Sequence, residues 1–479
     1  MQTVKDSLAL LGIHSHRPFT VRVTHRYIRF MPVNEAQLDD LTADTSLFFY
    51  DYPLDYEILV QGNFYREAGL SESVPTYQYV VIPDGHVFNT TIPHTVLDSL
   101  YLPEEDTMLL GAALNMNFDY GQKLVESAFD KVDEVIRPFT PWEDGAGDRV
   151  FITPKRSGQI RVFDNRLNEF IGLHGVEVTA RSGWRTRSGF TDANGNYTLS
   201  GDPFNNTVTY TIHFRRHGKF RIMNSKDVND AQIVRSGINS NTWNYDIPDG
   251  LDRMHATMFR AAYRYTLGNA DGLKRPIRNL RDQKLISKNK TKDWAGMNYY
   301  FFPNLKVARF EGAGNTNEFD CDEIYGITIH ELAHTAHVLT MNSAINYMGV
   351  DAWIAESWAV ACQWHLTNLE YRERGIPTYG DENYVITGLR RPHIFAYQYW
   401  NKAEDLEYTS LFINLFDNFN EFPTGPNFPN DQVSGYNLAT IQANYLKHMY
   451  SYASLTSYLK ANKPAGVTDA QIDLLLSSY

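Results

Sequence analysis

The sequence predicts a multidomain α+β protein made of an N-terminal α+β unit, a β-sandwich and a mainly helical C-terminal domain. The chain has 479 residues, which is more than a single hydrophobic core usually holds. Short alternating segments between turn residues fill its middle, and helical spacing of apolar residues begins near Pro248. We therefore place the domains at residues 1–143, 157–217 and 248–479.

The composition is that of an ordinary globular protein and excludes several classes of partner. Hydrophobic residues make up 43% and charged residues 21% of the chain. The net charge is −12 and no run of Lys and Arg forms a phosphate-binding stripe, so we expect no nucleic-acid partner. No apolar stretch reaches the length of a transmembrane helix. The first residues lack the basic start and apolar core of a signal peptide.

The N-terminal unit, residues 1–143, combines strand and helix patterns. Its predicted elements are strands over Val21–Val33 and Thr76–Ile82, a helix over Glu35–Leu41 capped by Asn34, and an amphipathic helix over Gln122–Ile136. We expect this unit to be a structural cap. An interaction module or a pro-segment is the alternative.

A segment rich in Pro and Gly, Pro138 to Gly147, marks a linker to the β-rich block. In this block the strands are predicted at Gly158–Phe163, Val176–Ala180, a segment after Gly195, and Val208–Phe214. The pair Asn194-Gly195 is expected to supply the positive φ angles of a tight turn. This succession of short strands and turns favours a β-sandwich.

Part of this block resembles the carboxypeptidase regulatory-like (transthyretin-like) domain. The matching residues are Leu173 to Val178, Thr191-Asp192 and Gly195-Asn196-Tyr197. The resemblance covers residues 157–217 and implies a non-catalytic sandwich, common in secreted and envelope-associated bacterial proteins. It therefore implies an extracytoplasmic location, secreted or associated with the cell envelope. A different immunoglobulin-like sandwich is the alternative.

The C-terminal domain is predicted to be mainly helical. The expected elements are a helix beginning near Leu251, a strand over Asn304–Phe310, and helices over Glu323–Leu339, Ala352–Leu369 and Asn437–Leu459. Its two cysteines, Cys321 and Cys362, either form a disulfide or remain as two buried free thiols, which is the commoner case.

One of these helices carries the motif His330-Glu331-Leu332-Ala333-His334, or HExxH. Residues four apart lie on the same face of a helix, so the two imidazoles can chelate one zinc ion. Glu331 lies beside the metal and can accept a proton from a water on it. The alternative is a solvated helix face with no metal.

A catalytic zinc ion needs a third protein ligand and an open fourth position. Glu356 is an acid in the otherwise apolar start of the next predicted helix, where a carboxylate needs a partner. We therefore predict Glu356 as the third ligand. His337, Asp351 and Glu370 are weaker alternatives, and a structural role is expected for His337.

The combination of HELAH with the later WxxExxA segment around Glu356 resembles the gluzincin zinc metallopeptidases. The resemblance implies His330, His334 and Glu356 as zinc ligands, Glu331 as general base and acid, and a gluzincin-like catalytic domain. Two departures leave the subfamily and substrate open. Before the motif, Gly312 to Asn315 stands where the aminopeptidase branch has GxMEN, and Val360 replaces the Asp of thermolysin-like enzymes.

Hydrolysis also needs a group that stabilises the oxyanion. The stretch 390–397 is polar amid apolar residues, and we select His393 and Tyr397 from it. His365 and Tyr399 are further candidates. A plain surface loop is the alternative for this stretch. Substrate is expected to pair as a strand along Asn304–Phe310, provided that this strand lies at a sheet edge.

These observations predict a zinc-dependent peptidase acting on a peptide, protein or glycoprotein substrate. The alternative is a non-catalytic surface protein that binds protein or glycan and keeps a vestigial metal site. Glu331 favours the enzyme, because a relic could lose this residue without losing the metal.

Overall fold

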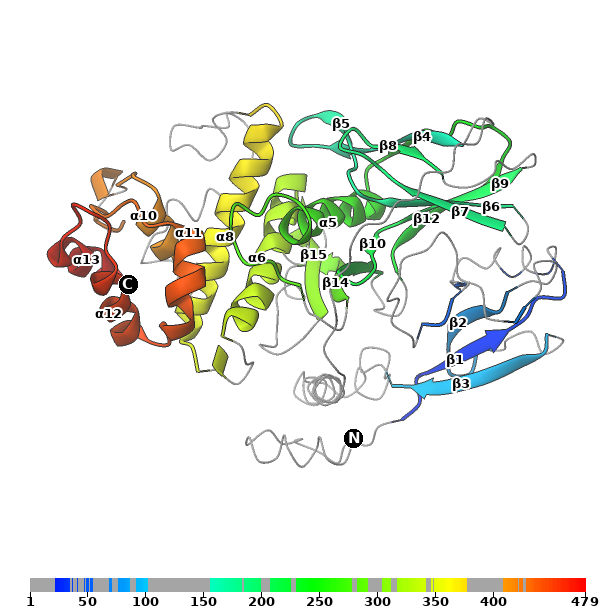
Figure 1. Ribbon diagram of the computed structural model, residues 1–479, viewed down its shortest axis with the longest axis horizontal. Coiled ribbons are helices and arrows are strands. Elements are labelled where there is room, and N and C mark those ends of the chain that lie inside the picture. Colours follow the sequence, from blue (N-terminus) through cyan, green and yellow to red (C-terminus); the bar gives the residue numbers. More distant parts are fainter. Residues whose placement is uncertain are drawn as a thin grey trace. The chain divides into compact units, whose positions relative to one another are not determined.

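The structure is a computed structural model that contains both helices and several sheets, as expected for an α+β protein (Figure 1). The described residues are 22–34, 37, 41, 47, 49–50, 52–54, 69–70, 76–86, 92–101, 156–182, 185–199, 207–224, 230–277, 282–291, 304–311, 317–341, 346–347, 349–376, 408–420, 422–424 and 428–479.

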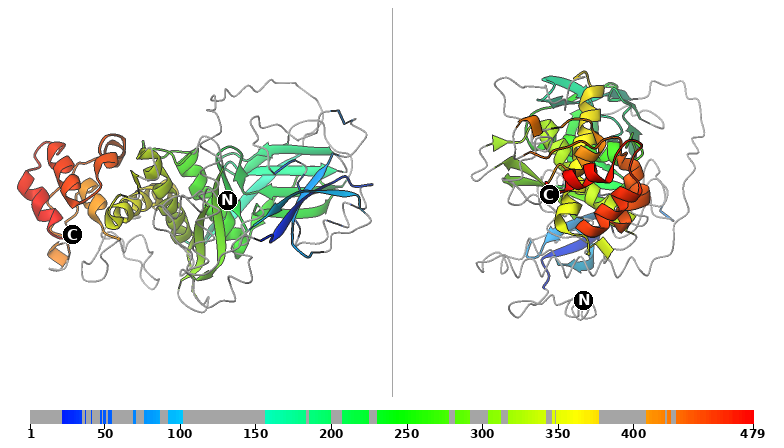
Figure 2. Two further views of the ribbon diagram at one scale, coloured as in Figure 1. Left: turned by 90° about the horizontal axis from the view of Figure 1, so that it is seen from below. Right: turned by 90° about the vertical axis from the view of Figure 1, so that its left-hand side faces the viewer.

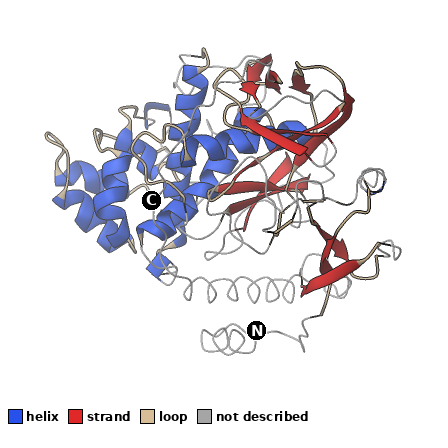
Figure 3. Cartoon of the chain, turned by 45° about the vertical axis from the view of Figure 1, so that its right-hand side comes forward, coloured by secondary structure: helices blue, strands red, loops and turns tan. Residues whose placement is uncertain are grey.

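The packing of the backbone divides the chain into two compact units. Unit 1 takes its described residues from 1–161, 172–246 and 279–282. Unit 2 takes its described residues from 162–171, 247–278 and 283–479. Strands dominate unit 1 and helices dominate unit 2, as the colours of Figure 3 make clear. Among the described residues, no helix combines the length and apolar character that crossing a membrane requires.

Unit 1 contains a three-stranded antiparallel sheet in the order β2-β1-β3. Its strands are β1 (His25–Phe30), β2 (Gln78–Pro83) and β3 (His94–Leu100). The first two confirm predicted strands, whereas β3 was not predicted. The side chain of Asn34 accepts the backbone N–H of Gln37 at 2.8 Å, the hydrogen bond expected of a helix cap. The helix predicted over Gln122–Ile136 and the linker before the β-rich block lie outside the described residues.

Two further sheets contain the strands of the β-rich block. One has the antiparallel order β12-β9-β6-β7, formed by β6 (Glu177–Ser182), β7 (Arg185–Phe190), β9 (Val208–His213) and β12 (Gln232–Ile238). The other has the order β13-β4-β5 with β8 on β4, formed by β4 (Ser157–Asp164), β5 (Glu169–Gly172), β8 (Asn196–Thr198) and β13 (Tyr245–Ile247). The four strands predicted here are confirmed. Buried and half-buried residues alternate along β9, the pattern of a strand with one face in a core.

The turn before β8 differs from the prediction in one respect. Gly195 has a positive φ of 80°, but Asn194 does not share this conformation. The Asp192 carboxylate instead accepts the backbone N–H groups of Asn194 at 2.9 Å and Asn196 at 2.8 Å, which forms the turn. A Cβ at position 195 would also lie 2.1 Å from the carbonyl oxygen of Ile160, so glycine is required there.

Unit 2 is built around three long helices and a parallel strand pair. The helices are α5 (Leu251–Thr266), α6 (Cys321–Thr340) and α8 (Ala352–Glu373). The strands are β14 (Gln283–Thr291) and β15 (Asn304–Glu311), with the short β16 (Asn317–Glu318) antiparallel to the end of β15. Helix α6 packs against α5, α8 and β15 and is the centre of the unit. The helix predicted to begin near Leu251, the helices predicted over Glu323–Leu339 and Ala352–Leu369, and the strand predicted over Asn304–Phe310 are confirmed, with ends shifted by a few residues.

The single helix predicted over Asn437–Leu459 is wrong, because the chain forms several short turns there. They are α11 (Leu438–Thr440), a π-helical turn at Ile441–Tyr445, a 3-10 turn at Leu446–His448 and α12 (Tyr452–Ala461). Ser451 is extended and forms a capping box with Ser454, which starts a new helix. The helices α10 (Leu411–Phe416) to α13 (Asp469–Leu476) lie at one end of unit 2 (Figure 2).

The tip of the β4–β5 hairpin, Val162–Ile171, belongs to unit 2 and contacts the start of α6. The side-chain nitrogen of Asn165 donates to the Asp320 carboxylate at 2.7 Å, and its oxygen accepts the backbone N–H of Cys321 at 2.8 Å. Arg166 forms a buried ion pair with Asp322 at 3.2 Å. The tip therefore satisfies polar groups at the first turn of α6 that the helix itself leaves unpaired.

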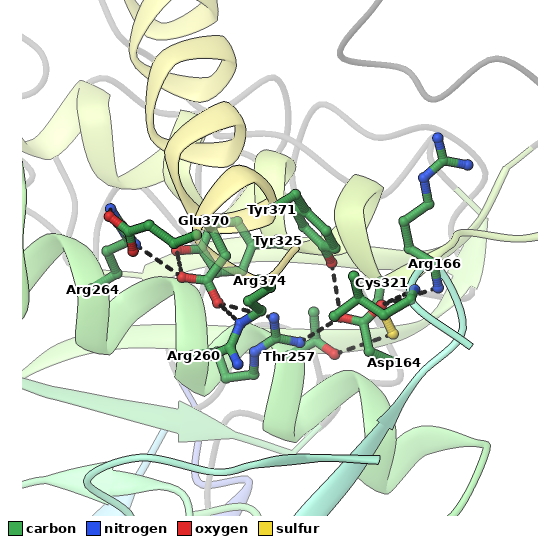
Figure 4. A network of polar contacts seen from close by, with 12 residues as sticks. Asp164, Arg166, Thr257, Arg260, Arg264, Cys321, Tyr325, Glu370, Tyr371 and Arg374 are labelled. Carbon is green, nitrogen blue, oxygen red and sulfur yellow. Dashed lines mark hydrogen bonds and ion pairs between the residues drawn. The ribbon is translucent and has the colours of Figure 1, made fainter. Parts of the chain in front are cut away.

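A buried polar network continues from this tip to α5 and α8 (Figure 4). Asp164 is fully buried and accepts hydrogen bonds from Arg260 Nη1 at 2.7 Å and the Tyr371 hydroxyl at 2.9 Å. Its other oxygen accepts the backbone N–H groups of Arg166 at 3.0 Å and Leu167 at 3.1 Å. The carboxylate is thus compensated on both oxygens, as a buried charge must be.

Glu370 on α8 forms the second centre of the network. It binds Arg260 at 3.1 Å, Arg264 at 3.0 Å and also Arg374, and Tyr325 on α6 donates to it at 3.4 Å. Burial opposes ionisation of Glu370, but the three guanidinium groups outweigh it and lower its pKa to about 2. The network therefore stays charged at neutral pH and joins α5, α6 and α8.

We expect Asp164→Asn to lower the free energy of unfolding by about 3 kcal/mol, because it leaves buried Arg260 with only part of its compensating charge. Chemical denaturation of both proteins measures this. The control is Asp246→Asn, which breaks the exposed ion pair with Arg161 and should cost less than about 1 kcal/mol. Equal losses in the two variants would contradict a special role for the buried network.

Asp431, near the C-terminal helices, is a buried acid with an unusual pKa. Its carboxylate accepts the backbone N–H of Val433 at 2.9 Å, and the residue is 4% exposed. Burial, with a smaller contribution from the charge of Asp417, raises its pKa to about 8 although the Val433 hydrogen bond opposes the shift. Ionisation of Asp431 therefore opposes folding, and stability is lost as pH rises from about 4 towards 8.

We expect Asp431→Asn to raise the melting temperature at pH 8 and to have a much smaller effect at pH 5. The amide keeps the hydrogen bond to Val433 and removes the buried charge, a gain of at least about 1 kcal/mol at the higher pH. Thermal unfolding at both pH values measures it. Asp469→Asn, at an exposed carboxylate, is the control and should give the same small effect at both.

Candidate metal centre

The predicted metal-binding residues come from two helices that run antiparallel. Helix α6 carries His330 and His334, and α8 carries Glu356. Gly326, near the start of α6, faces Gln363 in the middle of α8, whereas His334 faces Glu356 near the start of α8. The connection between the helices reverses the chain direction, so the first turns of α8 return beside the middle of α6.

The structure brings the three predicted ligands together at one point. Nε2 of His330 lies 3.0 Å from Oε2 of Glu356, and Nε2 of His334 lies 3.2 Å from the same oxygen. The two Nε2 atoms are 3.1 Å apart. Among the residues that the structure describes, this is the one group of three His, Cys, Asp or Glu side chains arranged so that it could hold a metal ion.

The donor set and its spacing fit a small divalent cation that accepts nitrogen and oxygen ligands. Ligand atoms placed about 2.0–2.1 Å from one zinc ion at tetrahedral angles lie about 3.3 Å from each other. The three observed distances of 3.0, 3.2 and 3.1 Å are close to this value. Three donors leave the fourth tetrahedral position for a water or a substrate atom.

The site is largely buried, which strengthens its electrostatics. His330 is 7% and His334 is 2% exposed, and the Glu356 side chain is 16% exposed. Burial alone would raise the pKa of Glu356, but His334 and His330 outweigh it and hold this pKa well below its usual range. Glu356 is therefore an anion in this setting and a suitable ligand for a cation.

A second layer of hydrogen bonds orients the two imidazole rings. Nδ1 of His330 lies 3.1 Å from Oε1 of Gln363, and Nδ1 of His334 lies 2.8 Å from the Tyr347 hydroxyl. Both Nδ1 atoms thus point away from the point where the Nε2 atoms meet. Such outer contacts are typical of metal-binding histidines.

Two further residues of α6, Glu331 and His337, occupy different surroundings. Glu331 follows His330 on α6 and is 4% exposed, so its carboxyl group is held within the protein. His337 is fully buried and packs edge-on against the rings of Tyr347 and Trp358. Burial, assisted by nearby His334, lowers the pKa of His337 to about 3. Its nitrogens are not part of the three-residue group, which agrees with the structural role expected for it.

The weaker alternatives for the third ligand are not placed at the histidine pair. Asp351 is the exposed residue before α8, and Glu370 is held by Arg260, Arg264 and Arg374. Neither belongs to the group that could hold a metal.

Of the residues predicted to stabilise the oxyanion, His365 lies in the described part of the chain. His365 is hydrogen-bonded to Asp271 at 2.7 Å and packs against Phe416. His393, Tyr397 and Tyr399 lie outside the described residues, as does the segment Gly312 to Asn315 before the motif.

The strand predicted to receive substrate is not the last strand of its sheet. β15 pairs in parallel with β14 along Asn304–Phe310, and β16 pairs with its end at Phe310 and Glu311. Within the described strands, β16 covers only this end of β15.

Three residues near the site were missed by the sequence analysis. Gln363 could have been found, because it follows Glu356 by two helical turns and so shares its face of α8. No sequence spacing connects Tyr347 or Tyr408 to the motif, and the chain has 30 tyrosines from which they could not be singled out. The ring of Tyr408 lies 5.9 Å from the ring of His330, measured between centroids.

The two cysteines are free thiols and form no disulfide with each other, which confirms the commoner of the two predicted cases. Cys321 and Cys362 are both free and buried, and burial raises the pKa of each thiol to about 12. They are therefore inert thiols that belong to the packing of α6 and α8.

Comparison with known proteins adds no relative to these observations. No protein-family model, no curated protein and no solved structure matches the chain. The interpretation of the site therefore depends on its residues and their geometry.

Proposed function

We propose that the protein is a zinc-dependent peptidase whose metal is held by His330, His334 and Glu356. The observation that carries this proposal is the meeting of two imidazole nitrogens and one carboxylate oxygen at distances of 3.0–3.2 Å in a buried site. The resemblance of the HELAH and WxxExxA segments to gluzincins supports it. The proposal includes a mainly helical catalytic domain of gluzincin type and a regulatory-like β-sandwich over residues 157–217.

Each residue of the site has a distinct part in the proposed hydrolysis. Zinc, when bound, would polarise a peptide carbonyl and increase the acidity of a water. Glu331 would accept the proton of the attacking water and pass it to the leaving amine. Gln363 and Tyr347 would hold the imidazoles in place. Tyr408 joins His393 and Tyr397 as a candidate for stabilising the oxyanion.

The proposed substrate is a peptide or protein, including glycoproteins, and the proposed location is outside the cytoplasm or at the cell envelope. Both follow from the two family resemblances. The same atoms also suit a second candidate, a surface protein that binds protein or glycan without catalysis. In that case the contacts of His330 and His334 with the Glu356 carboxylate would belong to a vestigial metal site.

The metal proposal predicts that the protein binds one zinc ion with high affinity and that Glu356→Ala weakens binding by roughly 100-fold or more. His337→Ala should leave zinc binding unchanged, because its nitrogens lie outside the ligand group. Elemental analysis and competition with a chromogenic chelator measure both. The third ligand is misassigned if the two variants behave in the opposite way.

The catalytic proposal predicts that Glu331→Gln lowers peptidase activity by about 10²–10⁴-fold while zinc content stays at the wild-type level. The amide keeps the shape of the side chain but cannot accept the proton. Cleavage of casein-type substrates by the zinc-loaded proteins measures it. Zinc bound by both proteins with no cleavage by either would favour the non-catalytic surface protein.

A further inference from the structure

We propose that Ser357 and Thr409 are positioning residues, and that the hydrogen bonds between them hold the ring of Tyr408 at the candidate metal centre. The inference deepens the proposed function, in which Tyr408 is one of three candidates for stabilising the oxyanion, and it rests on that function for its effect on catalysis. The placement of the Tyr408 ring is a property of the metal-free chain and is measured separately.

Ser357 and Thr409 form a hydrogen-bonded pair in the interior of unit 2. Oγ of Ser357 lies 2.6 Å from Oγ1 of Thr409, and it also accepts the backbone N–H of Thr409 at 3.2 Å. Ser357 is fully buried and Thr409 is 1% exposed. Polar groups buried in this way strongly disfavour the loss of a partner, so the pair holds its two segments at a fixed separation.

The position of the pair in the sequence connects two parts of the candidate site. Ser357 directly follows the ligand Glu356 on α8, and Thr409 directly follows Tyr408, 52 residues further along the chain. Neighbouring Cα atoms are about 3.8 Å apart. The backbone of Glu356 and the backbone of Tyr408 are therefore each one residue from the same hydrogen bonds, which fix one relative to the other.

The segment after Tyr408 is anchored on α8 and leaves Tyr408 at its border. Residues Thr409 to Phe412 are at most 1% exposed, whereas Tyr408 is only half-buried. Phe412 packs edge-on against Trp358, the residue after Ser357, with 5.3 Å between the ring centroids. Helix α10 continues this contact along α8 (Figure 1). Tyr408 is thus the residue at which the anchored segment meets the candidate centre.

The side chain of Tyr408 lies where it could contact a substrate. Its ring centroid is 5.9 Å from that of His330, and the two ring planes are inclined by 33°. A tyrosine hydroxyl can donate a hydrogen bond to a developing oxyanion. A misplacement of about 1 Å can lower the rate of an enzyme by about 100-fold. A tyrosine with this task needs neighbours that fix its backbone, and the Ser357–Thr409 pair meets that need.

Ser410 provides a matched control on the same segment. It is fully buried like Thr409, but its hydroxyl lies 3.0 Å from the hydroxyl of Tyr479 and not against Ser357. Thr409 differs in a second way, because its Oγ1 also accepts the backbone N–H of Leu411 at 3.3 Å. The Thr409 hydroxyl therefore joins α8 to the start of α10, whereas the Ser410 hydroxyl contacts the C-terminal residue.

The first experiment measures nuclear Overhauser effects between the ring protons of Tyr408 and His330 in the metal-free protein, with only tyrosine and histidine protonated in a deuterated background. Tyr408→Phe and His330→Asn variants assign the signals. We expect a contact between the two rings in the wild type, in Thr409→Ser, which keeps the hydroxyl, and in Ser410→Ala. The contact should weaken in Thr409→Val and be lost in Ser357→Ala, which removes both hydrogen bonds.

Two results of this experiment would overturn the inference. An unchanged contact in both Thr409→Val and Ser357→Ala would mean that other groups hold Tyr408. Absence of the contact in the wild type would mean that the ring does not lie at the candidate centre. Circular dichroism of each variant shows that the protein compared is folded.

The second experiment measures kcat, KM and zinc affinity with casein-derived peptides and the zinc-loaded protein. Thr409→Val should lower kcat by roughly 10–100-fold with little change in KM and with wild-type zinc affinity, because it displaces a group that acts in the transition state. Thr409→Ser and Ser410→Ala should both keep the wild-type kcat. In a Tyr408→Phe background, Thr409→Val should change kcat by less than about 2-fold, since the group that it positions is already lost.

The outcomes separate this inference from the proposed function. Equal losses from Thr409→Val in the two backgrounds would mean that Thr409 acts on something other than Tyr408. Zinc affinity that falls together with kcat would mean that the pair supports Glu356 instead. A wild type that neither binds zinc nor cleaves peptides would overturn the proposed function, while the ring contact in the metal-free protein would still decide whether Ser357 and Thr409 position Tyr408.

Discussion

The arrangement of unit 2 depends on the close approach of α6 and α8 at one point. There, two imidazole nitrogens and a carboxylate oxygen lie within 3.2 Å of each other in a largely buried site. Lone pairs at such distances repel unless a cation or a proton lies between them. The packing of the two helices therefore favours a positive charge between these atoms, and a bound metal ion, as proposed, would supply it.

The start of α6 and the end of α8 are held together by a carboxylate that has arginine partners. Tyr325 on α6 contacts Glu370 on α8, which is surrounded by guanidinium groups. Tyr325 immediately precedes Gly326, where the side chain of Gln363 fills the space between the helices. The polar network thus adjoins Gly326, where α6 and α8 leave room for the side chain of Gln363. Both regions place a carboxylate and its polar partners in a low-dielectric interior, where their geometry must be accurate.

Local patterns predicted local structure well in this chain. Alternation identified β1, β2 and the strands of the β-rich block, and apolar periodicity identified α5, α6 and α8. Prediction failed where side chains compete with the backbone. The capping box at Ser451 interrupts the helix expected over Asn437–Leu459, and the Asp192 carboxylate forms the turn before β8, in which only Gly195 adopts a positive φ.

The sequence alone determined that His330 and His334 share one helix face, because helical periodicity makes residues four apart neighbours. It favoured Glu356 over Glu370 because Glu356 is an acid in an apolar helix start, although the two are fourteen residues apart and lie on similar faces of α8. Tertiary structure decided this. Glu356 meets the imidazole pair, whereas Glu370 meets three arginines, two of them from α5. The role of a buried carboxylate is set by the charges that packing brings to it, and those come from distant segments of the chain.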